Sequence, residues 1–203
     1  MIYQKNNFKA DMLDPNYGNF PAMMAWEKPY MEKCVEVLKP HGDVLEIGFG
    51  MAYSATAINK YRLRSYTVME KDKGVIKKFH KWKVKQRNKK INVIKGLWQL
   101  RLPFINKKFD CIFFDDSPSG ELQQSLTPGK RNLLFLKLIL NNVKYNTRLA
   151  FFGSVPQKYD GYLTKHFKFK FHKFKIKIPY YCPYAKGEYM YVYEAVFRKK
   201  NEF

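Results

Sequence analysis

The chain has 203 residues, 46% of them hydrophobic, which is enough for a single domain with a sizeable core. No apolar run approaches the roughly 20 residues of a membrane-spanning helix, and the first residues lack the apolar stretch of a secretory signal peptide. The three cysteines (Cys34, Cys111 and Cys182) and the four histidines have no metal-ligand spacing. We therefore expect a cytoplasmic, reducing location and no metal site.

The formal net charge of +21 is concentrated in two stretches. Residues 71–90 contain ten Lys/Arg against Asp72 alone, and residues 161–203 contain ten against three acids. Such positive fields attract polyanions, which include nucleic acid and anionic membrane surfaces. A solvated lysine-rich surface without a partner explains the same composition, and the sequence leaves both readings open.

The first part of the chain leads up to one strand. Residues 1–22 mix polar and aromatic residues with two prolines and a glycine, which predicts an irregular segment. A helix is expected from Pro29, which suits a first helical position, and it should end before Pro40. Residues 44–47 then form the first strand of the predicted sheet.

A glycine-rich turn, Gly48-Phe49-Gly50, follows that strand, and residues 52–60 can begin a helix directly after it. Because glycine has no Cβ, such a turn lets the backbone approach a ligand closely. Strand, turn and helix N-terminus together predict the nucleotide-side cradle of a Rossmann-like sheet. A tight turn that binds nothing is the alternative for so short a motif.

A second strand is expected over residues 65–70, with Glu70 at its carboxyl end. Glu70 lies 22 positions after Gly48, close to the ~20 at which an acid meets the ribose hydroxyls in dinucleotide-binding folds. Residues 73–88 then place apolar side chains at helical spacing with lysines between them. This pattern predicts an amphipathic helix with a basic outer face.

The third and fourth strands are expected at residues 91–94 and 109–114. Ligands of open α/β sheets lie beyond the carboxyl ends of the strands, so we expect the residues that follow the four strands to gather at one edge. These residues are Gly48, Glu70, Trp98 and Asp115. For Asp115 and its neighbour Asp116, a turn or a helix cap is the alternative.

The last part of the chain changes in character. Residues 131–143 are predicted as an apolar helix and residues 149–153 as the fifth strand. Over residues 167–178 apolar residues alternate with lysines, with one change of parity at residues 172–173. This predicts an edge or half-exposed strand with a bulge there, its apolar face inward and its lysines outward. Residues 189–198 form the final strand.

Five strand units with intervening helices and a terminal antiparallel pair are typical of an α/β, Rossmann-like class I methyltransferase with a mostly parallel seven-stranded sheet. Glu46-x-Gly48-x-Gly50 favours S-adenosylmethionine (SAM) over NAD, because Tyr53 stands where the NAD motif has its third glycine. We expect one methyltransferase domain over residues 23–203, preceded by an N-terminal segment over residues 1–22.

Several motifs together carry a resemblance to one family. They are residues 23–31 (MMAWEKPYM), residues 44–52 (VLEIGFGMA), residues 95–98 (KGLW), Phe109-Asp110, and Asp115 followed three places on by Pro118. In this combination the chain resembles guanidinoacetate N-methyltransferase and its relatives that methylate the guanidino nitrogen of arginine. The resemblance covers about residues 23–155. It implies a SAM-dependent N-methyltransferase that acts on a guanidinoacetate-like small molecule or on arginine.

The resemblance also implies roles for particular residues. The residues expected to bind SAM are Met31, Glu46, Gly48, Phe49, Gly50, Met51, Ala52, Glu70, Trp98, Gln99 and Asp115. Among them, Glu70 is expected on the ribose hydroxyls, and Trp98 and Gln99 beside the adenine. The residues expected to form the acceptor pocket are Met23, Glu27 and Asp115, of which Glu27 and Asp115 are expected to be catalytic.

Two carboxylates suit a guanidino acceptor. A guanidinium is planar, and its paired N–H donors match carboxylates bidentately. It is a poor nucleophile while protonated, so Glu27 and Asp115 are expected to orient the nitrogen and to accept its proton. For Glu27, an acid that interacts with the dipole of a helix N-terminus is the alternative.

The chain also departs from the family. The segment before Glu27 is shorter, and only residues 156–166 separate the fifth strand from the sixth, so we expect the helix there to be shortened or absent. Asp116 is an additional acid that suits a more cationic acceptor.

Two other functions stay open. One is methylation of nucleic acid or of a protein bound to it, docked through residues 73–90 and 165–177, and the other is a basic binding module with weakened turnover.

Overall fold

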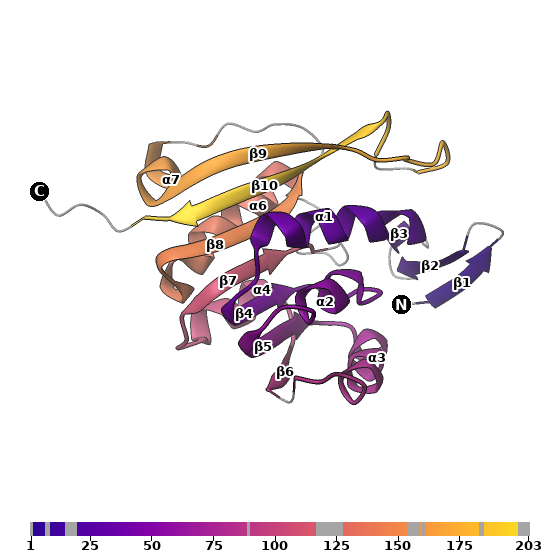
Figure 1. The fold of residues 1–203 in the computed structure, drawn as a ribbon, viewed down its shortest axis with the longest axis horizontal. Coiled ribbons are helices and arrows are strands. Elements are labelled where there is room, and N and C mark those ends of the chain that lie inside the picture. Colours follow the sequence, from indigo (N-terminus) through magenta and orange to yellow (C-terminus); the bar gives the residue numbers. More distant parts are fainter. Residues whose placement is uncertain are drawn as a thin grey trace, which may run out of the picture.

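The computed structural model describes residues 2–6, 9–14, 20–88, 90–116, 128–153, 159, 161–182 and 185–198. Its main sheet has seven strands: β4 (Gly42–Ile47), β5 (Leu63–Glu70), β6 (Ile91–Lys95), β7 (Phe109–Phe114), β8 (Val143–Gly153), β9 (Phe167–Lys175) and β10 (Tyr189–Phe197). Their order in space is β6-β5-β4-β7-β8-β10-β9 (Figure 1). β6, β5, β4, β7 and β8 run parallel, whereas β10 is antiparallel to both of its neighbours. The predicted fold class is confirmed.

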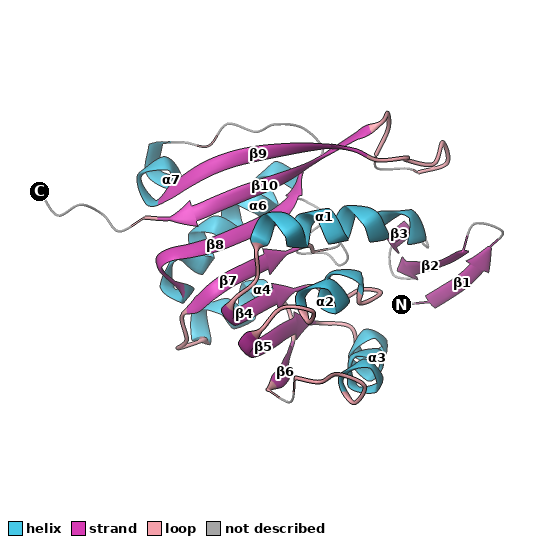
Figure 2. Cartoon of the chain, in the orientation of Figure 1, coloured by secondary structure: helices cyan, strands magenta, loops and turns pink. Residues whose placement is uncertain are grey.

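Helices cover both faces of this sheet (Figure 2). The helices are α1 (Lys28–Leu38), α2 (Tyr53–Ile58), α3 (Lys73–Lys83), α4 (Trp98–Arg101), α6 (Pro128–Leu138) and α7 (Gly161–His166). α1, α2 and α3 pack on one face, and α4, α6 and α7 pack on the other. Because successive strand residues point to opposite faces, Val44 joins the first core and Leu45 the second.

The helix predicted from Pro29 is confirmed as α1, and its end is tied to the sheet. Lys39 closes the helix in a left-handed conformation, with a φ of 54°. Arg148 of β8 donates to the last carbonyl groups, from Nε to Leu38 O at 2.9 Å and from Nη2 to Val37 O at 2.8 Å. These bonds satisfy carbonyls that a helix end leaves without partners, so α1 is held firmly against the sheet.

The prediction of an irregular segment over residues 1–22 is wrong. β1 (Ile2–Asn6), β2 (Lys9–Asp14) and β3 (Phe20–Met23) form a three-stranded antiparallel sheet beside the N-terminal end of α1 (Figure 1). Pro21 lies within β3, at an edge of this small sheet. An edge strand tolerates proline because it leaves one row of N–H groups without ladder partners, so the proline was no sign of irregular structure.

The predicted bulge in β9 is also wrong. β9 pairs with β10 along its whole length without a shift of register. The parity of its apolar residues changes because the strand serves two cores: Phe167 and Phe169 pack on the α6 face, and Phe174 packs on the α1 face. The lysines between them change face as well, so the predicted single lysine face is wrong. β9 is an edge strand, as predicted.

Between β8 and β9 the described structure contains only the six-residue helix α7, so the shortened helix is confirmed. The three cysteines are free and buried. Among the described residues, no helix has the length and apolar character that a bilayer span requires. The same residues contain no group of three or more His, Cys, Asp or Glu side chains that could hold a metal ion.

Candidate active site

The residues that follow four parallel strands meet at the carboxyl edge of the sheet, as predicted. Gly48 N–H donates to Met69 O at 3.0 Å, and Asp115 N–H donates to Ile47 O at 3.0 Å. A Cβ on Gly48 would lie 2.1 Å from the carbonyl oxygen of Asp115, and Gly48 has a φ of +88°. Glycine is therefore required here by the close approach and by the backbone conformation.

Glu70 joins the glycine turn to the beginning of α3. Its carboxylate accepts backbone N–H groups from Phe49 at 3.0 Å, from Lys71 at 2.8 Å and from Asp72 at 3.0 Å. Burial raises the pKa of Glu70, although these three bonds oppose the shift. The carboxylate is thus fixed at the end of β5, in the place predicted for the acid that binds ribose.

Glu46 lies beneath the turn. It is fully buried and accepts hydroxyl hydrogens from Ser54 of α2 and Tyr66 of β5. Burial raises its pKa to about 8, because removal from water disfavours the charged form. Glu46 therefore supports the turn from below, and its predicted contact with the cofactor stays a prediction.

Phe49 contributes to the edge through its backbone. Its side chain is 1% exposed and packs edge-on against Phe79 and Trp82 of α3, with ring centroids 5.3 and 5.5 Å away. The ring therefore anchors the turn to α3, and the N–H group of the same residue is bonded to Glu70.

Met23 connects the acceptor residues to the glycine turn. Its Sδ accepts the N–H of Met51 at 3.3 Å. Gly50 and Ala52, on either side of Met51, have positive φ values of 52° and 63°, which bend the turn toward this contact. Met31, one of the predicted cofactor residues, is fully buried on α1 and belongs to the same core as Met23.

Trp98 and Gln99 differ in their surroundings. Trp98 is 2% exposed, packs on Phe114 with ring centroids 5.2 Å apart, and donates its indole N–H to Asp116 Oδ2 at 2.7 Å. Both amide atoms of Gln99 are buried and have no hydrogen-bond partner in the described part of the chain. Buried polar atoms are rarely left unpaired, so Gln99 suits a polar ligand that offers both a donor and an acceptor.

Asp115 occupies a strongly perturbed environment. Burial and the neighbouring Asp116 raise its pKa to about 6, and Arg131 opposes the shift. Tyr30 and Cys34 of α1 lie close by: burial raises the pKa of each, and the charge of Asp115 adds to both shifts. A carboxyl group with this pKa, beside a candidate ligand site, is typical of a catalytic group.

Glu27 lies directly before α1, whose first residue is Lys28. Glu27 is 6% exposed, and its Oε1 accepts Met24 N–H at 2.7 Å. Asp115 and Glu27 both raise the pKa of the Cys34 thiol, which burial raises most. Both carboxylates therefore lie within electrostatic reach of one buried side chain, although 88 positions separate them in the sequence.

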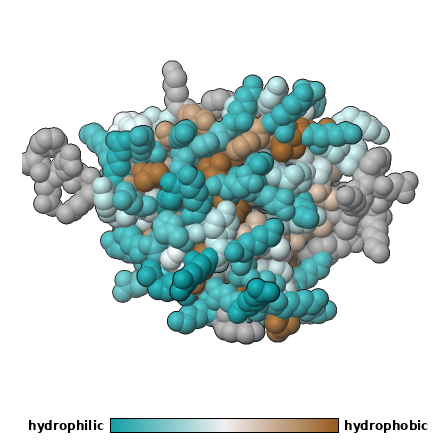
Figure 3. Space-filling model, in the orientation of Figure 1, coloured by the Kyte–Doolittle hydropathy of each residue, from teal (hydrophilic) through white to brown (hydrophobic). Residues whose placement is uncertain are grey.

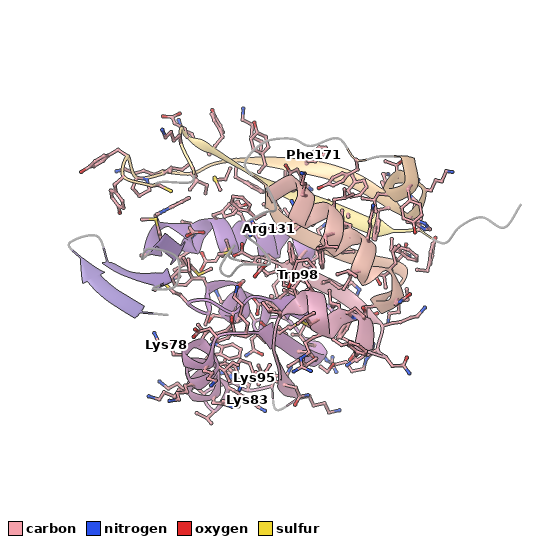
Figure 4. All side chains as sticks on the ribbon, turned by 180° about the vertical axis from the view of Figure 1, so that it is seen from behind. Lys78, Lys83, Lys95, Trp98, Arg131 and Phe171 are labelled. Carbon is pink, nitrogen blue, oxygen red and sulfur yellow. The ribbon has the colours of Figure 1, made fainter. Side chains whose placement is uncertain are left out.

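The sequence reading missed Arg131. This residue of α6 is 8% exposed, and its Nη1 donates to the carbonyl oxygen of Asp116 at 3.1 Å. Figure 4 shows Arg131 and Trp98 near the middle of the molecule, on α6 and α4. The available signal was an arginine directly before the apolar part of the predicted helix. Tyr30, a fully buried core residue of α1, donates its hydroxyl hydrogen to Tyr191 O at 2.5 Å.

Comparison with known proteins agrees with this geometry. The sequence profile of guanidinoacetate N-methyltransferase matches residues 6–127, which include β4 to β7 and both catalytic candidates. The chain belongs to the guanidinoacetate N-methyltransferase family. It is a SAM-dependent methyltransferase, as predicted.

Solved structures share the fold of this guanidinoacetate N-methyltransferase family member. An O-methyltransferase from Bacillus cereus in complex with SAH has a TM-score of 0.60 at 14% identity, over 90% of this chain and 86% of that chain. Spermidine synthase from Thermotoga maritima has a TM-score of 0.63 at 14% identity, over 99% and 73%. An rRNA methylase from Streptococcus thermophilus has a TM-score of 0.55 at 10% identity, over 84% and 95%. These identities indicate a shared fold and do not define an acceptor.

The residues at the edge fit SAM on two observations. The buried, unpaired amide of Gln99 matches the donor and acceptor edge of an adenine ring. Glu70 places a carboxylate at the end of β5, where ribose hydroxyls are held in related sheets. That each predicted residue of this guanidinoacetate N-methyltransferase family member contacts SAM stays a prediction.

Proposed function

We propose that the protein transfers the methyl group of SAM to a guanidino nitrogen, either of a small guanidino acid or of an arginine side chain. The observation that carries this proposal is that Asp115, at the edge beyond β4 and β7, and Glu27, next to α1, both raise the pKa of the buried Cys34 thiol. A guanidinium presents paired N–H donors that two carboxylates can accept at once. The small sheet β1–β3 is proposed as a lid, because Met23 at its end contacts the glycine turn.

The charges near this edge favour a cationic acceptor. Glu27, Asp115 and Asp116 carry three formal negative charges, and Arg131 supplies one positive charge beside the two aspartates. A guanidinium group would offset part of the remaining negative charge. Burying a charge without a counter-charge is costly, so these acids support an acceptor group that is positively charged.

Glu27 and Asp115 would act by orientation and proton removal. When bound, SAM supplies a methyl group on a positively charged sulfur, and the electrons of the broken bond return to that sulfur. Each carboxylate accepts N–H groups of the acceptor and holds one nitrogen toward the methyl group. With a pKa of about 6, Asp115 is ionised at neutral pH and is more basic than an ordinary carboxylate. It can therefore take the proton that the nitrogen loses.

The test is methyl transfer from labelled SAM to a panel of guanidinoacetate, other guanidino acids, arginine peptides and RNA. We expect a guanidino compound to be labelled. Asp115→Asn and Glu27→Gln should each lower turnover by about 10²–10⁴-fold, because each removes a group that acts on the acceptor. For Glu27→Gln, which is assigned to the acceptor alone, SAM affinity should stay within about threefold. Glu36→Gln, at an exposed acid of α1 that pairs with Lys33, is the matched control. Labelling of RNA with no guanidino product would contradict the proposal.

A second candidate is a nucleic-acid acceptor that docks on a basic surface of α3 and β6. Residues 71–95 contain eleven Lys/Arg and one acid, Asp72. In Figure 4, Lys83 of α3 and Lys95 of β6 lie in the lower part of the molecule, with Lys78 of α3 farther to the left, and the lower part of the molecule is mostly hydrophilic in Figure 3. β9 lies at the edge of the sheet opposite to β6, and its lysines face both sides of the strand, so they are separate from the surface of α3. Docking through residues 165–177 stays a prediction.

At the amino edge of the sheet, the basic side chains of Arg64, Lys107 and Lys144 form ion pairs with Asp43 or Asp110. If the surface on α3 binds a phosphate backbone, affinity for random RNA should fall steeply with salt, and Lys77→Glu with Lys81→Glu should weaken it at least tenfold. Lys107→Glu is the control. Equal binding by both variants would exclude this docking surface.

A further inference from the structure

The turn formed by Asp115 and Asp116 is held from two sides by distant parts of the chain. On one side, Trp98 Nε1 of α4 donates to Asp116 Oδ2 at 2.7 Å. On the other, Arg131 Nη1 of α6 donates to Asp116 O at 3.1 Å. Both side chains are buried, with 2% and 8% exposure. The position of Asp116, and with it the direction of the preceding residue, is therefore fixed by two helices (Figure 4).

We propose that Arg131 is a positioning residue for Asp115: it locks the turn that carries Asp115 and keeps a positive charge beside its carboxyl group. The inference rests on the proposed function, in which Asp115 acts on the acceptor. Arg131 acts through its neighbour and is not required to contact SAM or the acceptor.

The cost of burying Arg131 supports this role. Its Nε–H is buried and has no hydrogen-bond partner among the described residues, and burial lowers the pKa of the guanidinium. A buried donor without a partner destabilises the folded protein relative to a satisfied one. An apolar residue would pack in α6 without that cost, as Phe135 and Leu136 do. The charge of Arg131 therefore indicates a role other than packing of α6.

The titratable groups close to Asp115 show why a positive charge is required there. Asp116 lies next to it in the chain, Tyr30 and Cys34 approach from α1, and Glu46 lies on β4. Burial raises the pKa of Tyr30 and Cys34 and raises that of Glu46 to about 8, so these three groups are mostly neutral at pH 7. Asp116 is the acid that raises the pKa of Asp115. Arg131 is the positive group among the described residues that acts on Asp115. It counteracts the repulsion from Asp116, which otherwise favours a protonated Asp115.

The test compares Arg131→Met, which keeps length without charge, with Arg131→Lys, which keeps charge without the planar fork. Arg64→Met is the control, at an exposed arginine that pairs with Asp43 and Asp110 on the opposite edge. The readout is the titration of the Asp115 carboxyl carbon, followed by NMR with ¹³C-labelled aspartate and assigned with Asp115→Asn. It requires no acceptor, so it does not depend on the acceptor being identified correctly.

We expect the midpoint of Asp115 to rise by about one pH unit or more in Arg131→Met, less in Arg131→Lys, and not at all in Arg64→Met. With an active acceptor, the acid limb of the turnover profile should move by the same amount, with kcat lowered and SAM affinity kept. An unchanged midpoint in a folded Arg131→Met or Arg131→Lys variant overturns the proposal. A raised KM for the acceptor with no other change also overturns it, because it would make Arg131 an acceptor ligand. A shifted midpoint in a protein that labels no guanidino compound supports the role of Arg131 and contradicts the proposed acceptor.

Discussion

The proposed cofactor side and the proposed acceptor side of the sheet edge are built differently. On the cofactor side, the Glu70 carboxylate accepts N–H groups from Phe49 in the glycine turn and from Lys71 and Asp72, all within residues 49–72. On the acceptor side, Glu27, Asp115 and Arg131 come from three regions spread over more than 100 residues. The first arrangement is encoded locally and the second depends on the packing of the whole domain. Substitutions should therefore damage the two sides in different ways.

The largest expected effect is that of Gly48→Ala on the cofactor side. The new Cβ would lie 2.1 Å from Asp115 O at a φ of +88°, so overpacking and backbone strain act together. We expect SAM binding to be lost in calorimetry and the free energy of unfolding to fall by about 3 kcal/mol or more. Because Gly48 also packs against the backbone of Asp115, we expect Gly48→Ala to disrupt the cofactor side and the acceptor side together.

Gly187→Ala is the matched control for that variant. Gly187 has a φ of +86°, nearly that of Gly48, but a Cβ added at Gly187 would meet no described atom within 4 Å. Strain alone should therefore lower the free energy of unfolding by about 1 kcal/mol and leave SAM binding intact. Equal losses in the two variants would mean that the close approach to Asp115 has no role.

Glu70→Gln should affect the cofactor side alone. The carboxylate accepts three backbone N–H groups, and an amide in its place turns a second donor toward them. We expect SAM affinity to fall about 10- to 100-fold, since hydrogen bonds to charged groups contribute about 1.5–3 kcal/mol. Glu188→Gln, at an exposed acid that pairs with Lys175, should leave calorimetric binding unchanged. Unchanged binding in Glu70→Gln would remove this residue from the cofactor site.

The pH dependence of turnover should report the acceptor side. Asp115 has a pKa of about 6, and its carboxylate form is the base, so kcat/KM should rise with pH up to about 6 and then level off. Below that value the rate should change by about tenfold per pH unit. Rate measurements between pH 4.5 and 8.5 test this, and a profile that is flat through pH 6 would exclude Asp115 as the base.

The smallest effect is expected from Glu46→Gln. The pKa of Glu46 is raised from its ordinary value of 4.5 to about 8, so between these values the folded protein keeps a proton that the unfolded chain has released. Stability contributed by this group is therefore present below pH 4.5 and is lost as the pH rises to about 8. Glutamine resembles the protonated acid and should remove this dependence. Thermal unfolding at pH 5 and pH 8.5 measures it, and parallel curves for both proteins would contradict it.

The sequence predicted the locally encoded features better than those that depend on how the domain packs. The strand ending in Gly48, the strand ending in Glu70 and the helix after Pro29 rest on local patterns, and the structure confirms them. The bulge in β9 was wrong because a change of parity has two causes, and only the arrangement of the two cores distinguishes them. Arg131 was missed because its contact with Asp116 depends on how α6 packs, which no local pattern contains.

The central claim is that Glu27 and Asp115 face one acceptor beside bound SAM. A crystal structure of the protein with SAH and guanidinoacetate measures this directly. We predict that oxygen atoms of both carboxylates lie within about 3.2 Å of guanidino nitrogens, and that one of these nitrogens points toward the sulfur of SAH. A structure in which either carboxylate faces away from the guanidino group would contradict the account.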